Sequence, residues 1–111
     1  MKKTWNDEMY EIQADFCRAI AHPRRLKMLE LLREKPRTVT EMADLLDTTP
    51  PNISQHLKIL MAHGILERKK NGVRVLYSLA YPELVDVEEK VREILAEVIR
   101  KRGSLLQAFK G

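Results

Sequence analysis

The residues best able to bind another molecule lie between Thr48 and Gly64, a segment whose pattern predicts one helix. Asn and Gln side chains can offer a donor and an acceptor together to adenine, and Ser and Lys side chains reach phosphates or base edges. At about 100° per residue, the positions opposite or flanking the apolar stripe of this helix are Pro51, Asn52, Ser54, Gln55, His56, Lys58, Ile59 and Ala62. This face has no acid and is typical of a nucleic-acid recognition helix, the alternative being the solvated face of an ordinary amphipathic helix.

The predicted recognition helix has recognisable start and stop residues. Thr49 can cap the first turn, and Pro50 suits the first helical position because its missing N–H leaves no helical partner unsatisfied. Gly64 stands where a left-handed residue often ends a helix. The stripe that must face a core consists of Ile53, Leu57, Leu60 and Met61.

The net charge of +4 is concentrated in one part of the chain. Of 20 basic and 16 acidic residues, the segment from Thr48 to Leu79 holds five basic residues and one acid, and the remaining fifteen of each cancel. The five are Lys58, Arg68, Lys69, Lys70 and Arg74. A localised basic surface of this kind favours a nucleic-acid partner.

Two extended runs follow this helix, Ile65–Lys70 and Val73–Leu79. They flank Asn71-Gly72, which predicts a hairpin with a type I′ turn because both central residues of that turn need positive φ. Arg68, Lys69, Lys70 and Arg74 are expected to gather at its tip. A basic hairpin after a helix-turn-helix is typical of a winged helix; a solubilising edge hairpin is the alternative.

Three shorter helices are expected before the recognition helix. The first spans about residues 6–20, with an apolar stripe of Met9, Ile12, Phe16, Ala19 and Ile20. The second runs from Pro23 to about Glu34. The third covers about Glu41 to Leu46 and has two candidate starts, a Thr40 cap or a capping box from Thr38 to Glu41. With the recognition helix it makes a helix-turn-helix over about residues 40–63.

The last predicted helix spans about residues 82–109 and carries a long apolar stripe. Its members are Leu84, Val87, Val91, Ile94 or Leu95, Val98, Leu105 or Leu106, and Phe109. Because a small domain offers little core for so long a stripe, we expect it to pack with the first helix against a second copy of the chain. Packing within one chain is the alternative.

Length and composition limit the architecture. A chain of 111 residues, 44% of them apolar and 32% charged, is typical of a single folded domain over residues 1–111. No run approaches the roughly 18 apolar residues of a membrane span, and no apolar signal core follows Met1, so we expect no membrane partner and a cytoplasmic location. The expected fold is mainly α with a small β-hairpin wing. One cysteine, Cys17, excludes an internal disulfide.

With these residues in place, the chain resembles the ArsR (ArsR/SmtB) family of winged-helix transcriptional regulators. The resemblance rests on Ala21–Leu29, Thr38–Ala43, Asn52–Leu60 and Gly64–Leu66, in this order. It implies a homodimer that binds double-stranded DNA at a roughly palindromic operator and represses transcription until a small effector lowers its affinity.

The effector sites of that family do not carry over to this sequence. Its thiolate site needs cysteines where this chain has Thr40–Leu45, and its other site needs histidines on the last helix, where Asp86 and Glu88 stand and no histidine follows Pro82. Carboxylates alone are poor ligands for transition metals, so we expect no metal and no cofactor in those places, and the effector stays unknown.

Cys17 and the three histidines are the remaining reactive residues. Cys17 is a candidate thiol sensor near the expected dimer seam, or a buried inert cysteine. His22 is expected to be a turn or packing residue. His56 and His63 could contact phosphate, or be surface or hydrogen-bonded side chains without a ligand role.

These observations predict a sequence-specific DNA-binding repressor. A winged-helix module that binds proteins and no longer reads DNA is the alternative. An enzyme is not expected, since the sequence has neither a Ser-His-Asp arrangement nor a Gly-rich phosphate loop. The predicted DNA contacts are Thr49, Pro51, Asn52, Ser54, Gln55, His56, Lys58, Arg68, Lys69, Lys70 and Arg74.

Overall fold

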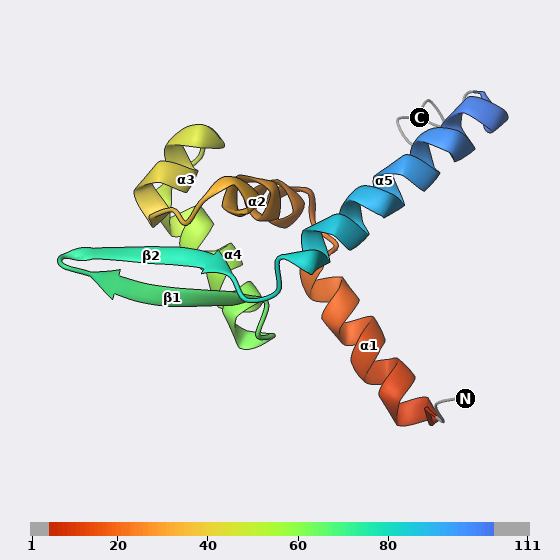
Figure 1. Cartoon of the computed structure of the whole chain (residues 1–111), viewed down its shortest axis with the longest axis horizontal. Helices are drawn as coiled ribbons and strands as arrows, with labels where there is room; N and C mark the ends of the chain where they lie inside the picture. Colours follow the sequence, from red (N-terminus) through yellow and green to blue (C-terminus); the bar gives the residue numbers. More distant parts are fainter. Residues whose placement is uncertain (1–4, 104–111) are drawn as a thin grey trace. The chain divides into compact units, whose positions relative to one another are not determined.

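The structure is a computed structural model that describes residues 5–103. Its elements, in chain order, are α1 (Asp7–Ile20), α2 (Pro23–Glu34), α3 (Val39–Leu45), α4 (Pro50–Ala62), β1 (Leu66–Asn71), β2 (Arg74–Leu79) and α5 (Glu83–Arg102) (Figure 1). The predicted mainly α fold with one antiparallel hairpin is confirmed. None of the helices within residues 5–103 is long and apolar enough to cross a bilayer.

The chain divides into two compact units, Met1–Tyr81 and Pro82–Gly111. The first contains α1 to α4 and the hairpin, and α5 is the described part of the second. The assignment of residues 1–111 to one functional domain stays a prediction.

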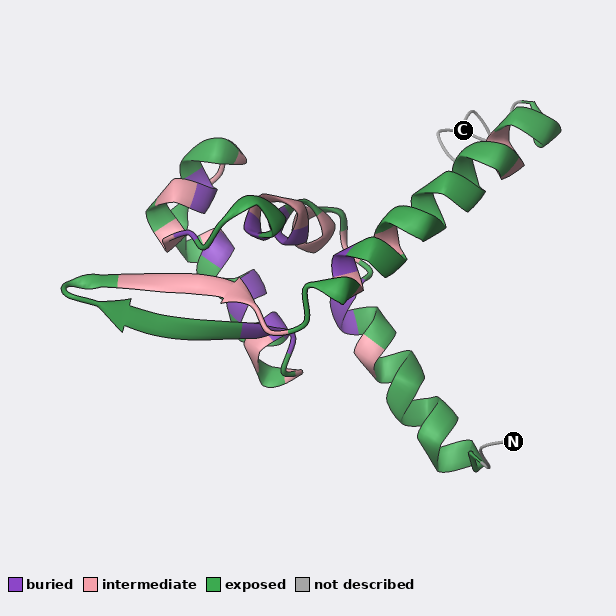
Figure 2. Cartoon of the chain, viewed as in Figure 1, coloured by how far each residue is buried: buried purple, intermediate pink, exposed green. Residues whose placement is uncertain are grey.

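The core of the first unit lies where α2, α3, α4 and the start of β1 meet. Met28 and Leu29 of α2, Met42 of α3 and Ile53 and Leu60 of α4 are almost fully buried (Figure 2). The predicted stripe of α4 is therefore confirmed except at Met61. This residue is only half-buried because it lines an open space between α4 and the hairpin.

The predicted ends of α4 are confirmed by its hydrogen bonds and backbone angles. The Thr49 hydroxyl accepts the Asn52 backbone N–H at 3.3 Å, and Pro50 is the first helical residue. Gly64 has a φ of 73°, so it supplies the left-handed residue that lets the chain leave the helix towards β1.

Helix α3 begins with the capping box rather than with Thr40. The Thr38 hydroxyl accepts the Glu41 backbone N–H at 3.1 Å, and the Thr38 backbone N–H donates to Glu41 Oε1 at 2.8 Å. Two N–H groups that the helix cannot satisfy are thereby paired, so the helix starts at Val39. After its last turn, Asp47 takes a positive φ of 54° in the turn that leads to α4.

The hairpin turn lies one residue later than the sequence predicts. Asn71 pairs with Arg74, so the two-residue loop is Gly72-Val73 and the expected Asn71-Gly72 type I′ turn is wrong. Gly72 has a φ of 68°, whereas neither Asn71 nor Val73 has a positive φ. Glycine alone at the first central position is the pattern of a type II′ turn, which needs only one residue with positive φ.

A short backbone bridge joins the hairpin to the end of α2. The Arg37 N–H donates to the Tyr77 carbonyl at 3.0 Å, and the Tyr77 N–H donates to the Arg37 carbonyl at 2.8 Å. The buried Arg37 side chain then donates from Nε to the Leu31 carbonyl at 3.1 Å and pairs with Glu34. Strand β2 is thus tied to the same helix that supports α3 and α4.

Helices α1 and α5 each leave much of their apolar stripe exposed. On α1 only Ala19 and Ile20 are buried, while Met9 and Ile12 are exposed. On α5, Val85 is buried, whereas four other apolar residues are 43–56% exposed: Val87, Val91, Ile94 and Leu95. The predicted members Leu105, Leu106 and Phe109 lie outside the described residues.

The capping box predicts a difference between two threonines that stand two residues apart. Thr38→Ala should lower the free energy of unfolding by about 1 kcal/mol, because the Glu41 N–H loses its acceptor. Thr40→Ala, on the exposed side of the first turn, should change it by at most about 0.5 kcal/mol. Urea denaturation of both variants measures the difference, and equal losses would contradict the assigned start of α3.

Candidate nucleic-acid interface

The exposed face of α4 carries the polar residues that the helical pattern places there. Thr49, Pro51, Ser54, Gln55 and Lys58 are exposed. They are available to a partner because Ile53, Leu57 and Leu60 anchor the opposite side of the helix in the core. The face presents an amide, hydroxyls and one ammonium, which are the groups that bind base edges and phosphates.

Asn52 is half-buried, and a neighbour that sequence reasoning missed orients its amide. The Thr48 hydroxyl donates to Asn52 Oδ1 at 3.1 Å, so the amide oxygen is engaged and the NH₂ group is left to donate. Gln55 is exposed, so its amide is more available than that of Asn52 to offer adenine a donor and an acceptor together. The four-residue spacing of Thr48 and Asn52 across the helix start could have indicated this contact.

The position of His56 corrects the assignment of this residue as a DNA contact. His56 is 9% exposed, and Arg25 Nη1 donates to its Nδ1 at 3.2 Å. Burial, followed by the nearby His22 and the charge of Arg25, lowers the pKa of His56, because each of these disfavours the charged ring. His56 follows Ile53 by three residues, so it lies beside the buried stripe, and this spacing could have indicated its burial.

Arg24 and Arg25 on α2 hold the two helices of the helix-turn-helix. Arg24 Nη1 donates to the Leu46 carbonyl at the end of α3 at 2.8 Å, while Arg25 contacts His56 on α4. His22 caps α2, because its Nδ1 accepts the Arg24 backbone N–H at 3.0 Å, and its ring centroid lies 4.6 Å from that of His56. The expectation that His22 is a turn or packing residue is confirmed, and the tethering role of the two arginines was not predicted.

The four basic residues of the hairpin do not form one cluster. Arg68 pairs across the hairpin with Tyr77 and Lys70 with Val75, and because side chains alternate along a strand, Lys69 points to the opposite face. All four lie in the strand pairs next to the turn, as expected, but they do not share one face of the hairpin. The strand pleat divides them between two faces, with Arg68 and Lys70 on one and Lys69 and Arg74 on the other.

Arg74 is held by an acid from α3. Its Nη2 lies 3.1 Å from Glu41 Oε2, while Glu41 Oε1 still accepts the Thr38 N–H. The hydrogen bond from Thr38 and the charge of Arg74 lower the pKa of the Glu41 carboxyl. Arg74 thus links the hairpin to the first turn of α3, although half of its side chain stays exposed.

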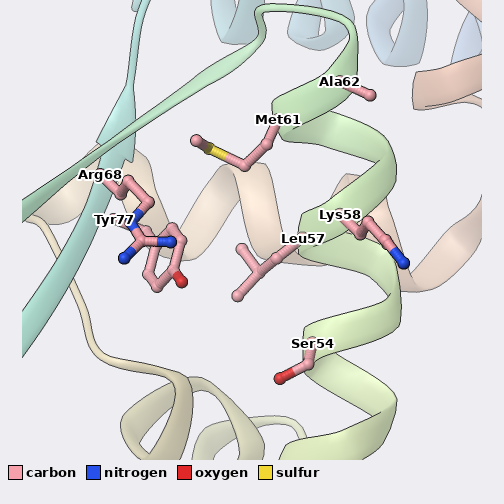
Figure 3. A pocket seen from close by; sticks show the side chains of 7 residues that line it. All are labelled: Ser54, Leu57, Lys58, Met61, Ala62, Arg68 and Tyr77. Carbon is pink, nitrogen blue, oxygen red and sulfur yellow. The ribbon is translucent and has the colours of Figure 1, made fainter.

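A cleft of about 420 Å³ lies between α4 and the hairpin. Leu57 and Met61 point from α4 towards the hairpin, and Arg68 and Tyr77 face them (Figure 3). Ser54, Lys58 and Ala62 complete the lining. The cleft therefore brings together three of the predicted DNA-contact residues, Ser54, Lys58 and Arg68.

His63 is a hydrogen-bonded side chain and not an open phosphate ligand. Its Nδ1–H donates to the Ile59 carbonyl at 2.9 Å, and its Nε2 lies 3.1 Å from Asp15 Oδ2 on α1. The carbonyl and the Asp15 carboxylate raise the pKa of the imidazole, because both favour its protonated form. His63 therefore joins the end of α4 to α1.

Cys17 is exposed on α1, so the alternative of a buried cysteine is wrong within this chain. Its role as a thiol sensor stays a prediction. Within residues 5–103, no three His, Cys, Asp or Glu side chains are grouped closely enough to hold a metal ion.

Comparisons with known sequences place this chain among regulatory proteins. Residues 22–68 match the model of the ArsR family of bacterial regulatory proteins. The uncharacterized HTH-type transcriptional regulator Rv0081 of Mycobacterium tuberculosis is 31% identical over 103 residues, which cover 92% of this chain and 90% of the relative. The transcriptional repressor SmtB of the same organism is 39% identical over 80 residues, covering 72% and 59% of the two chains.

Solved structures agree with these relationships. A crystal structure of Rv0081 superposes with a TM-score of 0.79 at 32% identity, covering 87% of this chain and 98% of that one. The transcriptional repressor PagR of Bacillus anthracis superposes with a TM-score of 0.65 at 28% identity, covering 78% of this chain and 99% of that one.

The His63 contacts predict a pH-dependent stability. The pKa of His63 in the folded chain lies above the usual value of about 6.5. Its contacts therefore add fully to the free energy of unfolding at a pH below about 6.5, and this contribution is lost as the pH rises through the folded pKa. His63→Gln should therefore lower the free energy of unfolding more at about pH 5.5 than at about pH 8.5. Urea denaturation at both values tests this.

Asp15→Asn is the matched control for the His63 prediction. Asp15→Asn should cause part of the decrease in the free energy of unfolding that His63→Gln causes at about pH 5.5. The double variant should lose less stability than the sum of the two single variants, since both remove the same contact. Equal losses from His63→Gln at the two pH values would contradict the assigned protonated contact.

Proposed function

Because this chain belongs to the ArsR family of bacterial regulatory proteins, whose members are transcriptional regulators and not enzymes, we propose that it is a homodimeric repressor of transcription. It binds double-stranded DNA through α4 and the hairpin. The repressors SmtB of M. tuberculosis and PagR of B. anthracis support the direction of regulation. A DNA target places its action in the cytoplasm, and we assign it no catalytic activity.

The observation that carries this proposal is the exposed, acid-free face of α4. Gln55 and Lys58 project from it, and Ser54 and Asn52 flank them. Gln55 is the residue we assign to base reading, since its amide can offer both a donor and an acceptor to adenine. Lys58 and Ser54 are assigned to the phosphates beside the groove that α4 enters.

The hairpin supplies the remaining phosphate contacts in this proposal. Arg68, Lys69 and Lys70 alternate between its two faces, so the hairpin presents positive charge to a backbone on either side. Arg74 is better assigned to positioning the hairpin through Glu41, with its exposed half also able to reach a phosphate. The proposed DNA contacts are thus Thr49, Pro51, Asn52, Ser54, Gln55, Lys58, Arg68, Lys69, Lys70 and Arg74, without His56.

Two exposed apolar stripes support the proposed homodimer. Val87, Val91, Ile94 and Leu95 of α5 recur at steps of three and four residues, so they share one side of the helix. Exposed apolar stripes on two helices are typical of protein–protein interfaces. We propose that this side of α5 and the exposed side of α1 are buried against a second copy of the chain, as the family resemblance implies.

A two-fold dimer determines the form of the DNA site. Each copy presents one α4, so two copies read two equivalent half-sites in opposite directions. We therefore propose a roughly palindromic operator, with half-site centres about one helical turn or a multiple of it apart.

The DNA assignment predicts different effects for Gln55 and Lys70. Gln55→Ala should cost about 1–3 kcal/mol on the preferred duplex but little on others, because it removes a base contact. Lys70→Ala should weaken all duplexes by a similar factor and reduce the salt slope by about one per protomer, because it removes a phosphate contact. Fluorescence anisotropy at two salt concentrations measures both.

The duplexes for this experiment come from selection of binding sites from a random pool. Lys27→Ala is the matched control for Lys70→Ala, because it removes one positive charge from an exposed position on α2 that is outside the proposed DNA set. No binding at low salt would overturn the repressor assignment and favour a protein-binding winged helix. Identical behaviour of the Gln55 and Lys70 variants would overturn the division into base and phosphate contacts.

The dimer proposal predicts opposite results for two glutamate substitutions on α5. Val91→Glu should raise the dimer dissociation constant by about a hundredfold or more, because it buries a carboxylate without a partner. Ala96→Glu, on the other side of the same helix and exposed, should leave the dimer intact. Sedimentation equilibrium distinguishes the two, and a dimer unaffected by Val91→Glu would contradict the proposed interface.

A further inference from the structure

The cleft between α4 and the hairpin has walls that DNA contact alone does not require. Leu57, Met61 and the Tyr77 ring give it an apolar side (Figure 3). Phosphates need only cations and hydrogen-bond donors, so these residues have no part in the proposed DNA contacts. A volume of about 420 Å³ is comparable with small-molecule sites, which span roughly 300–1,000 Å³.

The polar part of the same cleft is positively charged. Arg68 and Lys58 line it together with the Ser54 hydroxyl, and none of the lining residues is an acid. Within the described part of the chain, no ion pair joins either cation to a carboxylate. Glu67 does not compensate Arg68, because alternation along β1 directs it to the other face of the hairpin.

We infer that this cleft binds a small organic anion with an apolar body. The acid group lies on the Arg68 guanidinium, whose planar donors suit a carboxylate, sulfonate or phosphate, with Lys58 adding positive potential at the rim. The body lies against Leu57, Met61 and Tyr77. Charge complementarity therefore selects an anion, and the apolar wall selects an organic one over an inorganic ion.

Binding in the cleft has a consequence for DNA. Ser54, Lys58 and Arg68 are also proposed DNA contacts, so a ligand that covers them and a duplex exclude each other. This part of the inference rests on the proposed function. It assigns the effector to a chemical class, organic anions with an apolar body, and places its site inside the DNA-binding surface.

Three probes separate the charge from the apolar body. They are 8-anilinonaphthalene-1-sulfonate, the neutral N-phenyl-1-naphthylamine with the same rings, and inorganic sulfate. Amide chemical shifts of the full chain, followed by two-dimensional NMR, locate each probe. The sulfonate should shift Leu57, Arg68 and Tyr77 and bind there about tenfold more tightly than either of the other probes. Shifts confined to Val87–Leu95, or equal binding of any two probes in the cleft, would overturn the inference.

The hairpin offers a matched pair of variants. Arg68→Ala and Lys69→Ala each remove one positive charge from adjacent residues of β1, but only Arg68 lines the cleft. Arg68→Ala should weaken sulfonate binding in the cleft by about tenfold, and Lys69→Ala should change it by less than about twofold. Equal weakening would show attraction to net charge and overturn the site. The NMR spectra report at the same time that both variants are folded.

A competition experiment tests release of DNA separately. The sulfonate probe should displace a selected duplex from the wild-type chain at concentrations that fill the cleft. Filling of the cleft without displacement would overturn the effector role. Absence of any DNA binding would instead overturn the proposed function, while the anion site, measured without DNA, would stand.

Discussion

The structure depends on the burial of one side of α4. Ile53 and Leu60 are fully buried, and Leu57 is nearly so, each contributing about 1.5–3 kcal/mol relative to an exposed position. If α4 were rotated about its axis by one residue, which is about 100°, polar side chains such as Ser54 would enter the core, where they would have no hydrogen-bond partners. The apolar stripe therefore decides which side chains face a duplex, although none of its members contacts one.

Apolar burial has no direction, so the orientation of α4 needs polar contacts as well. Two histidines provide them, and their pKa values are shifted in opposite directions. Burial lowers the pKa of His56, whose Nδ1 accepts a hydrogen bond from Arg25, whereas the carbonyl of Ile59 and the carboxylate of Asp15 raise the pKa of His63. One contact ties α4 to α2 and the other ties it to α1. Through His63, the recognition helix is connected to a helix of the proposed dimer interface.

The hairpin is positioned by a similar combination of contacts. The backbone bridge between Arg37 and Tyr77 ties β2 to the end of α2, and the ion pair of Arg74 with Glu41 ties it to α3. Glu41 serves both the capping box and this ion pair, so the start of the helix-turn-helix and the place of the hairpin are coupled. The cleft between α4 and the hairpin is the space that these contacts leave open, and its shape depends on all of them.

The amino-acid sequence by itself determined the helices, the ends of α4, the presence of the hairpin and the concentration of charge, because these follow from spacing and from residues within one or two turns of each other. Only the tertiary structure decided that His56 is buried against Arg25, that Arg74 pairs with Glu41, and that Arg68 faces Leu57 across a cleft. The turn at Gly72-Val73 is a borderline case, since Asn71-Gly72 is a strong local pattern that strand pairing shifted by one residue. The physical reason is that hydrogen bonds, ion pairs and burial act over distances of a few ångströms in space, and a local pattern does not encode which residues 30 positions apart will lie that close.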